Sequence, residues 1–264
     1  MAQNEVISIP FRVVVSCVAG LPLSALLLCV LTSLLIHFQQ ATSTHCGVQN
    51  WLPSVSAATA TYSPEKYIWR TLISLHIAPR FFLAIAYRNF LITSPLQPLS
   101  NTCTFRLLCQ ISCVLQCVEN FFLLMLTVIS STENHTAHAV CFGAFIISSL
   151  MYMILSTWLY SYSGRRRAFS TSIGEASFEY KCLASSLSFI SVVVAAYLYY
   201  RHNTYCEPGV YTLFAFSEYM IIVTNIAFHS TLYLDFHGKS LSIRSSSLGD
   251  QYEMLLPTLI DKDT

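Results

Sequence analysis

The sequence predicts an all-α, polytopic transmembrane helix bundle with about six spans and both termini in the cytosol. Its 264 residues are 54% hydrophobic and only 10% charged, whereas soluble domains average about a quarter charged. The mean hydropathy is +0.55, and several apolar stretches reach the roughly 20 residues that a helix needs to cross a bilayer. A soluble enzyme could not cover its surface with 14 basic and 13 acidic residues, and a net charge of +1 excludes a typical nucleic-acid binder.

The apolar stretches differ in the polar residues that they contain. They run over residues 13–37, 67–91, 107–129, 138–162, 182–200 and 210–234. The first is interrupted only by Gly20 and Pro22, the fourth is almost free of charge, and the fifth is rich in serine, valine and alanine. The second, third and sixth carry ionisable side chains, which are costly inside a bilayer. Residues 1–236 are therefore predicted to form the membrane domain, and the polar residues 237–264 a flexible cytosolic tail.

Lysine and arginine are distributed unequally between the loops, and this distribution predicts the orientation of the bundle. With the N-terminus in the cytosol, that side holds most of the basic loop residues, including Arg165, Arg166 and Arg167 directly after the fourth span. The opposite side holds only Lys66 and Arg201 near its loops. Because loops next to a span are more basic on the cytosolic side, both termini are expected there.

Two features of the lumenal loops fit this orientation. Asn134-His135-Thr136 is a glycosylation sequon, and Asn134 is a candidate acceptor only on the lumenal side. Cys46 and Cys206 also lie in lumenal loops, where a disulfide is chemically allowed. The alternative that they are two unrelated thiols stays open.

Polar side chains inside three spans follow helical spacing, so each span presents a polar stripe. The stripes consist of His76, Arg80 and Tyr87 in the second span, Ser112, Gln116 and Glu119 with Asn120 beside them in the third, and Glu218, Asn225 and His229 in the sixth. Arg80 has Glu119 and Glu218 as candidate partners of opposite charge. One interpretation is a salt-bridge network that sets the register of the helices. The other is a polar cavity that holds a charged headgroup or transfers protons.

Several enzyme signatures are absent from the sequence. It has no Gly-x-Ser-x-Gly elbow, so no hydrolase-type serine nucleophile is indicated, and no His-Glu-x-x-His zinc helix. We therefore expect no metal and no cofactor. Cys109, Cys113 and Cys117 recur every four residues in the third span, a pattern that we interpret as helix packing by small residues.

Several segments of the loops and spans carry a more specific signal. They are Thr44-His45-Cys46-Gly47-Val48, Asn50, Leu52-Pro53-Ser54-Val55-Ser56, Trp69-Arg70, Leu75-His76, Ala78-Pro79-Arg80-Phe81, Val118-Glu119-Asn120, Arg201-His202-Asn203, Tyr205-Cys206-Glu207, Glu218-Tyr219, Thr224-Asn225 and Ala227-Phe228-His229. In this order they resemble the post-GPI-attachment-to-proteins factor two family. The resemblance covers residues from about 12 to 236. It extends more loosely to the wider group of FRAG/DRAM/SFK-like membrane proteins.

This resemblance implies lipid remodelling of glycosylphosphatidylinositol (GPI) anchors in the Golgi membrane, or also in the endoplasmic reticulum. In that reaction a lyso-GPI-anchored protein is re-acylated at sn-2 with a saturated, typically stearoyl, chain. The implied partners are GPI-anchored proteins, lyso-GPI lipid, an acyl donor lipid and other GPI-remodelling enzymes. The resemblance leaves open a non-catalytic subunit that presents lyso-GPI to a separate acyltransferase. A transporter or scramblase is a third alternative, against which the lack of internal repeats counts.

A catalytic version requires a base for the lysolipid hydroxyl, a donor or cation for the oxyanion, and a site at the depth of the acyl chains. The candidate catalytic residues are His76, His202, His45, Glu119 and Glu218, with histidine as the base and glutamate as its orienting group. The candidate binding residues are Arg70, Arg80 and Arg201 for the inositol phosphate, Asn120, Asn203 and Asn225 for the carbonyl, and His229. Because His229 lies toward the cytosolic half of its span, it ranks below the others as a base.

Overall fold

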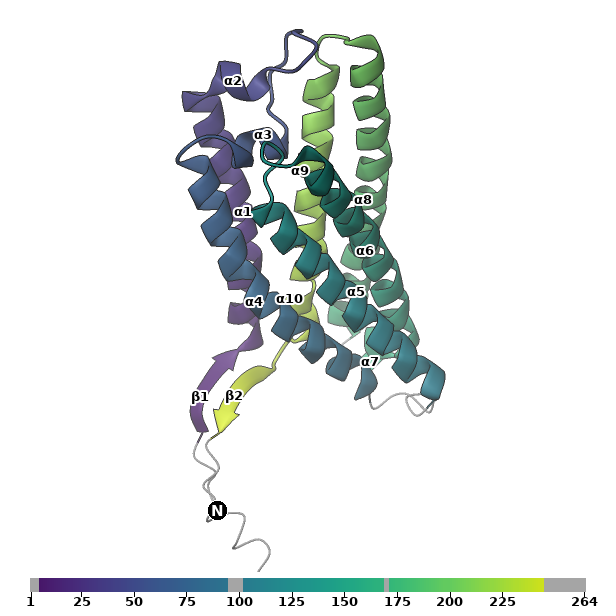
Figure 1. Ribbon diagram of the computed structural model, residues 1–264. Coiled ribbons are helices and arrows are strands. Elements are labelled where there is room, and N and C mark those ends of the chain that lie inside the picture. The colour runs from purple at the N-terminus through teal and green to yellow at the C-terminus, as the bar shows by residue number, and fades with distance from the viewer. Residues whose placement is uncertain (1–4, 95–101, 169–170, 245–264) are drawn as a thin grey trace, which may run out of the picture.

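The computed structural model describes residues 5–94, 102–168 and 171–244 of the chain (Figure 1). The elements follow in the order β1 (Glu5–Pro10), α1 (Phe11–Ile36), α2 (Phe38–Thr42), α3 (Val55–Ala60), α4 (Glu65–Ile92), α5 (Cys103–Val128), α6 (His135–Tyr162), α7 (Arg165–Ala168), α8 (Thr171–Tyr205), α9 (Val210–Ser230), α10 (Leu232–Asp235) and β2 (Ser240–Arg244). Residues 245–264, most of the predicted tail, lie outside the described part.

Six helices are long and apolar enough to cross a membrane, which confirms the predicted all-α, multi-pass bundle. They are α1, α4, α5, α6, α8 and α9, and they fall on the six predicted stretches. Helix α8 begins at Thr171, well before the apolar stretch predicted from residue 182. Its first turns contain Glu175, Glu179 and Lys181, so hydropathy does not reveal that they belong to a long helix.

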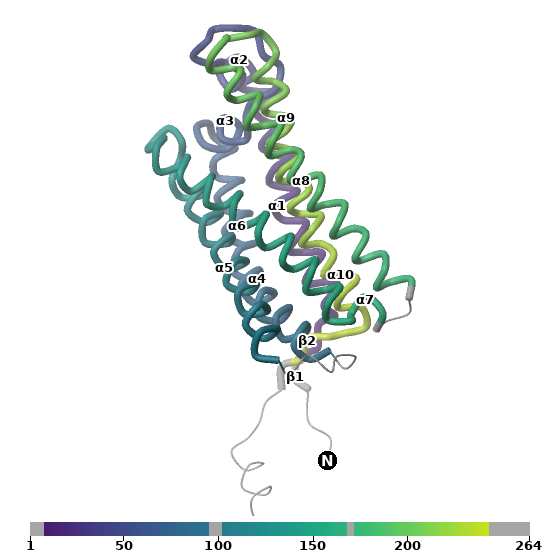
Figure 2. Tube along the Cα trace, turned by 90° about the vertical axis from the view of Figure 1, so that its right-hand side faces the viewer, coloured from purple at the N-terminus to yellow at the C-terminus, as the bar shows by residue number. Residues whose placement is uncertain are grey.

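The helices diverge toward one end of the bundle. Helix α8 packs along α9, α5 along α6, and α1 along α4. In the side view, α4, α5 and α6 lean away from α1, α8 and α9 toward the end where α2 and α3 lie (Figure 2). We call this the disulfide end, because Cys46 and Cys206 are bonded there, and the opposite end, with β1 and β2, the strand end.

Aromatic packing and a short ribbon close the strand end. Strands β1 and β2 pair antiparallel, with Ile9 opposite Leu241. The rings of Phe11 and Phe236 stack 4.4 Å apart, and Phe90 packs 5.2 Å from Phe236. The ribbon thus connects the start of α1 to the segment after α10, and it is the only β-structure in the described residues.

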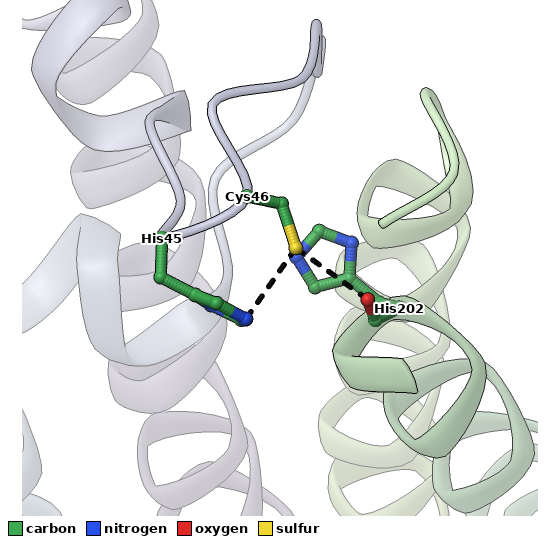
Figure 3. Close-up of side chains that lie close together, drawn as sticks. All are labelled: His45, Cys46 and His202. Atoms are coloured by element: carbon green, nitrogen blue, oxygen red, sulfur yellow. Dashed lines mark hydrogen bonds between the residues drawn. The ribbon is translucent and has the colours of Figure 1, made fainter. Parts of the chain in front are cut away.

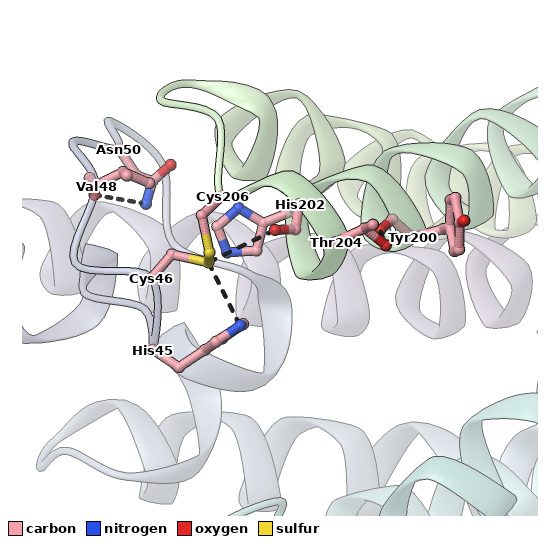
Figure 4. The surroundings of a disulfide bond; sticks show 8 residues. All are labelled: His45, Cys46, Val48, Asn50, Tyr200, His202, Thr204 and Cys206. Carbon is pink, nitrogen blue, oxygen red and sulfur yellow. Dashed lines mark hydrogen bonds between the residues drawn. A yellow bond between two sulfur atoms is a disulfide. The ribbon is translucent and has the colours of Figure 1, made fainter.

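Two covalently joined loops form a cap at the disulfide end (Figure 4). The disulfide between Cys46 and Cys206 links the segment after α2 to the end of α8, with their Cα atoms 5.3 Å apart. Next to it, the backbone N–H of Gly209 donates to the carbonyl of Gln49 at 3.1 Å. Gly209 has a φ of +80°, and a Cβ there would lie 2.9 Å from the ring of Trp51. The cap therefore requires glycine at this position.

Candidate functional site

A buried carboxylate of one predicted polar stripe, in the middle of the bundle, has its partners on the other two stripes. Oε1 of Glu119 on α5 accepts hydrogen bonds from Nη2 of Arg80 on α4 at 2.8 Å and from Nδ2 of Asn225 on α9 at 2.7 Å. Nε2 of His229 lies 3.1 Å from the same oxygen. The side chains of Glu119 and Arg80 are 0% and 3% exposed. We call these four residues with His76 the central cluster.

The neighbours of the central cluster fix the orientation of its two histidines. Nδ1 of His76 lies 2.6 Å from the carbonyl of Val18, so it carries a proton and leaves Nε2 to accept from Arg80 Nη1 at 3.3 Å. Nε2 of His229 lies 2.5 Å from Arg80 Nη2 as well as near Glu119. It can accept from the guanidinium or donate to the carboxylate, but a single nitrogen cannot do both at once.

Several polar atoms around the central cluster lack a partner among the described residues. They are Oε2 of Glu119, Nε of Arg80, both amide atoms of Gln116 and of Asn120, and the hydroxyl of Ser112. Buried polar atoms are nearly always hydrogen-bonded to protein or to ordered water. The interior of the bundle at this level is therefore a polar region inside an apolar fold.

The central cluster opens into an internal space, the central cavity, with a volume of about 100 Å³. Its walls include His76, Arg80, Asn225 and His229, together with apolar side chains of α1, α4, α6 and α9. Glu218, one helical repeat away from Asn225 on α9, also lines it. Arg80 and Glu218 thus face one cavity, as the spacing predicts, whereas Glu119 reaches it only through Arg80 and Asn225.

A second, larger space lies between α6, α8 and α9 at the disulfide end, with a volume of about 600 Å³. Drug-sized ligands occupy pockets of roughly 300–1,000 Å³. Ile147 and Tyr199 line this lateral cavity and are also 61% and 44% exposed on the outside of the bundle, so it opens sideways between α6 and α8. Its walls are largely apolar, which suits a hydrocarbon chain.

The two cavities meet at a small group of residues that line both. They are Ser56, His138, Phe142, Glu218 and Ile221. Oε2 of Glu218 accepts a 3.0 Å hydrogen bond from the backbone N–H of Val55 and so holds the start of α3 against α9. Oγ of Ser56 lies 3.0 Å from Nε2 of His138, whose Nδ1 lies 2.8 Å from the carbonyl of Ile129.

Ser56 and His138 were not among the candidate catalytic or binding residues predicted from the sequence. Ser56 follows a helix-capping serine, and His138 lies in the first turn of an apolar span, so neither belongs to a polar stripe. They are 82 residues apart in the chain. The sequence holds two signals for them: Ser56 ends one of the loop segments that carry the family resemblance, and His138 is a histidine at the start of the fourth span, two residues after the Asn134 sequon.

The predicted residues nearest the loops of the disulfide end form a separate group. Arg70 pairs with Glu133 at 3.6 Å, and Arg201 pairs with Glu207 at 2.7 Å, all with exposed or half-exposed side chains. Asn203 is exposed on the last turn of α8. These residues surround the disulfide end, and none of them lines either cavity.

His45 and His202 lie beside the sulfur atom of Cys46 (Figure 3), and neither of them lines either cavity. Their rings are 5.5 Å apart, and Nε2 of His45 is 3.4 Å from Sγ of Cys46. The ligand atoms of His45, Cys46 and His202 lie within 4.8 Å of one another. A metal ion would require the thiolate of Cys46, but this sulfur is bonded to Cys206. The arrangement shown therefore offers an ion only two imidazoles.

A second buried ion pair lies at the strand end. Nζ of Lys181 on α8 is 2.6 Å from Oδ2 of Asp235 on α10, and Ser177 bonds both partners at 2.8 and 2.5 Å. Nearby, Arg165 donates to the carbonyl of Phe90 at 2.5 Å, and burial lowers the pKa of its guanidinium. Because the charges of Lys181 and Asp235 are fully paired, we assign this cluster to helix packing.

The chain resembles a group of membrane proteins over most of its length. Residues 10–239 match the Frag1/DRAM/Sfk1/Cwh43P N-terminal domain family. The chain is 59% identical over 264 residues to "Post-GPI attachment to proteins factor 2" of Caenorhabditis briggsae, covering 100% of this chain and 99% of the relative. It is 38% identical over 243 residues to "Acyltransferase PGAP2" of Xenopus tropicalis, covering 92% and 94%. No solved structure matches.

Proposed function

The chain belongs to the Frag1/DRAM/Sfk1/Cwh43P family and to its post-GPI attachment to proteins factor 2 members, and from this premise we propose that it re-acylates lyso-GPI-anchored proteins. The acceptor is the free sn-2 hydroxyl of the lyso-GPI glycerol, and the product carries a saturated, stearoyl chain. The Golgi membrane is the proposed location. The names of the relatives support the assignment, since one describes a factor acting after GPI attachment and another an acyltransferase.

The junction of the two cavities carries this proposal. Acyl transfer between lipids must bring a hydroxyl and an acyl carbonyl together at the depth of the chains, beside a group that can take up a proton. The lateral cavity offers apolar walls that open to the bilayer, and His138 and Glu218 stand where it meets the central cavity. Polar groups converging on an apolar pocket are the usual form of a lipid or small-molecule site.

The orientation of the bundle agrees with a lumenal acceptor. The GPI glycan and its protein lie on the lumenal side of the membrane, so the lateral cavity must open into that leaflet. Disulfides persist in oxidising compartments, and the bond between Cys46 and Cys206 therefore supports a lumenal disulfide end. Arg165, Arg166 and Arg167 at the strand end then face the cytosol, as basic loop residues do.

In this proposal the arginines have different tasks. Arg80 is paired with the carboxylate of Glu119, which Asn225 also holds in place. Arg80 is therefore not free to bind a phosphate. We assign it to positioning His76 and His229. Arg70 and Arg201 lie at the disulfide end with side chains 40% and 42% exposed. They are the better candidates for the inositol phosphate, because their acidic partners can be exchanged for a ligand at little cost.

The pairing of the central cluster also favours a second candidate function. A buried carboxylate whose Oε1 is bonded to both Arg80 and Asn225 is what a register-setting network requires. In that case the cavities bind lyso-GPI and present it to a separate acyltransferase. The two functions differ in one measurable respect, which is whether the purified chain moves an acyl group.

Reconstitution of the purified full chain separates them. Liposomes would contain a lyso-GPI-anchored protein as acceptor and either a phospholipid with a labelled stearoyl chain or stearoyl-CoA as donor. We expect label at the sn-2 position of the GPI product. Acceptor binding with no transfer from either donor would exclude the acyltransferase and leave the presenting function. Imaging of the tagged chain against Golgi and endoplasmic reticulum markers tests the location.

A further inference from the structure

We propose that Ser56 is the nucleophile that carries the acyl group and that His138 is its general base, an inference that rests on the acyl transfer proposed above. The transfer would then proceed in two steps through an acyl ester on Ser56. This role is additional to the histidines and glutamates of the polar stripes, because neither Ser56 nor His138 belongs to one. It explains how an acyltransferase works here without a Gly-x-Ser-x-Gly elbow.

The hydrogen bonds of His138 set the direction of its bond with Ser56. A backbone carbonyl only accepts, so the 2.8 Å contact between Nδ1 of His138 and the carbonyl of Ile129 places a proton on Nδ1. Nε2 of the neutral ring then has a free lone pair. The hydroxyl of Ser56, 3.0 Å away, therefore donates to Nε2. This is the arrangement that activates a serine: the base accepts its proton, and a third group orients the base.

Both side chains are held by well-defined local structure. Ser56 is the second residue of α3, whose first turn is capped by Oγ of Ser54 accepting from the N–H of Ala57 at 3.1 Å. The Tyr219 hydroxyl donates to the carbonyl of Pro53 at 2.5 Å and anchors the same segment to α9. His138 lies in the first turn of α6, which Asn134 caps through its side-chain oxygen. Two capped helix starts thus face each other.

The position of the pair suits a lipid substrate. Ser56 and His138 are both half-buried, and both line the central and the lateral cavity. A chain lying in the lateral cavity can therefore place its carbonyl at Ser56 from the bilayer side. Glu218 lies at the same junction and anchors α3 through Val55. We regard Glu218 as a positioning residue for Ser56.

In the first step, Oγ of Ser56 attacks the carbonyl carbon of an acyl ester in a glycerophospholipid. The new Oγ–C bond forms, and the serine proton passes to Nε2 of His138. The bond between the carbonyl carbon and the glycerol oxygen breaks, and that oxygen takes the proton from Nε2. The products are acyl-Ser56 and a lysophospholipid, with His138 neutral again. An acyl-CoA thioester would react in the same way, with a thiol as the leaving group.

In the second step, the sn-2 hydroxyl of lyso-GPI gives its proton to Nε2 of His138 and attacks the carbonyl of acyl-Ser56. The new ester forms, the Oγ–C bond breaks, and the serine oxygen regains its proton from Nε2. No electrons are exchanged with an outside partner, and no further reactant is needed. The chain returns to its starting state after each transfer.

The same hydrogen bond could serve only to tie α3 to α6. A single neutral hydrogen bond contributes little to stability, so Ser56→Ala should fold in either case. The experiment must therefore detect the acyl-enzyme itself. The purified full chain in liposomes is mixed with a phospholipid carrying a labelled acyl chain, without acceptor, and the labelled peptide is identified by mass spectrometry. A parallel sample with labelled acyl-CoA identifies which donor is used.

We expect labelling of Ser56 by one donor and release of the label when lyso-GPI-anchored protein is added. Ser56→Ala should lose both labelling and transfer, whereas Ser56→Cys should still be labelled, as a thioester that neutral hydroxylamine cleaves. His138→Gln should slow labelling by about 100-fold or more, the usual contribution of a general base. Ser43→Ala and His237→Gln are matched controls, because both residues are exposed and line neither cavity.

The outcomes separate this inference from the function on which it rests. Transfer by Ser56→Ala at the wild-type rate, or label on another residue, would overturn the nucleophile and leave the acyltransferase intact. Labelled Ser56 with no transfer to lyso-GPI would overturn the proposed acceptor and keep the nucleophile. A wild-type chain that is neither labelled nor active with either donor would overturn both.

Discussion

Arg80 and Glu119 form an ion pair, 2.8 Å long, that is almost completely closed to solvent on both sides. The pair joins α4 to α5, and Asn225 joins α9 to the same carboxylate oxygen. An ion pair in an apolar interior contributes little by itself, because removing both charges from water offsets much of their attraction. Each of the two charges is nevertheless costly to bury without the other, so removing one partner should destabilise the fold.

This dependence predicts the effect of breaking the central pair. Glu119→Gln or Arg80→Ala should lower the free energy of unfolding by about 3–5 kcal/mol, because each leaves one charge buried without its partner. The apolar double variant Arg80→Met/Glu119→Leu should recover much of that loss. Urea or thermal unfolding of the purified chain in detergent measures both.

Arg70→Ala is the matched control for the central pair, since Arg70 and Glu133 form an exposed pair. Such pairs contribute about 0–1 kcal/mol. If Arg70→Ala destabilised the chain as much as Glu119→Gln, the burial of the central pair would not be the cause.

The disulfide predicts a second effect on stability. Cys46→Ser/Cys206→Ser should destabilise the chain by about 2–4 kcal/mol, because the bond connects segments 160 residues apart in sequence. In the unreduced wild type, a maleimide reagent applied after unfolding should leave Cys46 and Cys206 unmodified. Cys103→Ser, at an exposed free thiol, should leave both stability and labelling of the other cysteines unchanged. Labelling of Cys46 before reduction would contradict the bond.

The backbone conformation of Gly209 in the cap leads to a third prediction about stability. Gly209→Ala should destabilise the chain by about 1–3 kcal/mol, because alanine is strained at a φ of +80° and its Cβ would press on the ring of Trp51. Gly20→Ala is the control, since that glycine is helical and has open space around its Cβ position. It should be neutral or stabilising by up to about 1 kcal/mol. Thermal unfolding of the two variants makes the comparison. An equal loss of stability in both would show that the φ angle of Gly209 is not the cause.

The sequence predicted the long helices and the residues of the central cluster. Apolar length alone placed the six spans, because a bilayer leaves no other way to satisfy the backbone. Helical periodicity placed Arg80, Glu119 and His229 on inward stripes, and a bilayer permits few positions for such groups except against one another. Their contacts in the structure follow from those two rules.

Other contacts join residues that are distant in the sequence, and the helical periodicity of polar residues does not predict them. Lys181 lies in polar turns before the apolar part of α8, and only the fold brings it to Asp235. Ser56 and His138 meet because a short helix from the first long loop reaches the start of α6. His45 and His202, which the sequence suggested as candidate bases, lie beside the disulfide and line neither cavity. These positions depend on how loops fold over the helix ends.

The lateral cavity predicts a chain-length effect on acyl transfer. Ala196 lines the cavity on α8, whereas Val193, three residues earlier, does not line it and is 53% exposed. Ala196→Trp should fill the space beside α6 and lower kcat/KM for a stearoyl donor by about tenfold or more, which is about 1.4 kcal/mol of activation free energy or more. A short octanoyl donor should be affected less, because it needs less of the cavity.

Val193→Trp adds the same side chain on the same helix but outside the cavity, so it should leave the preference for chain length unchanged. The ratio of kcat/KM for the two donors is the decisive measurement, because a general loss of folded protein lowers both values equally. If Ala196→Trp reduced both donors to the same extent, or if Val193→Trp changed the ratio as well, the acyl chain would not lie between α6 and α8. The chain would then have to reach Ser56 from the central cavity, whose volume of about 100 Å³ leaves far less room for it.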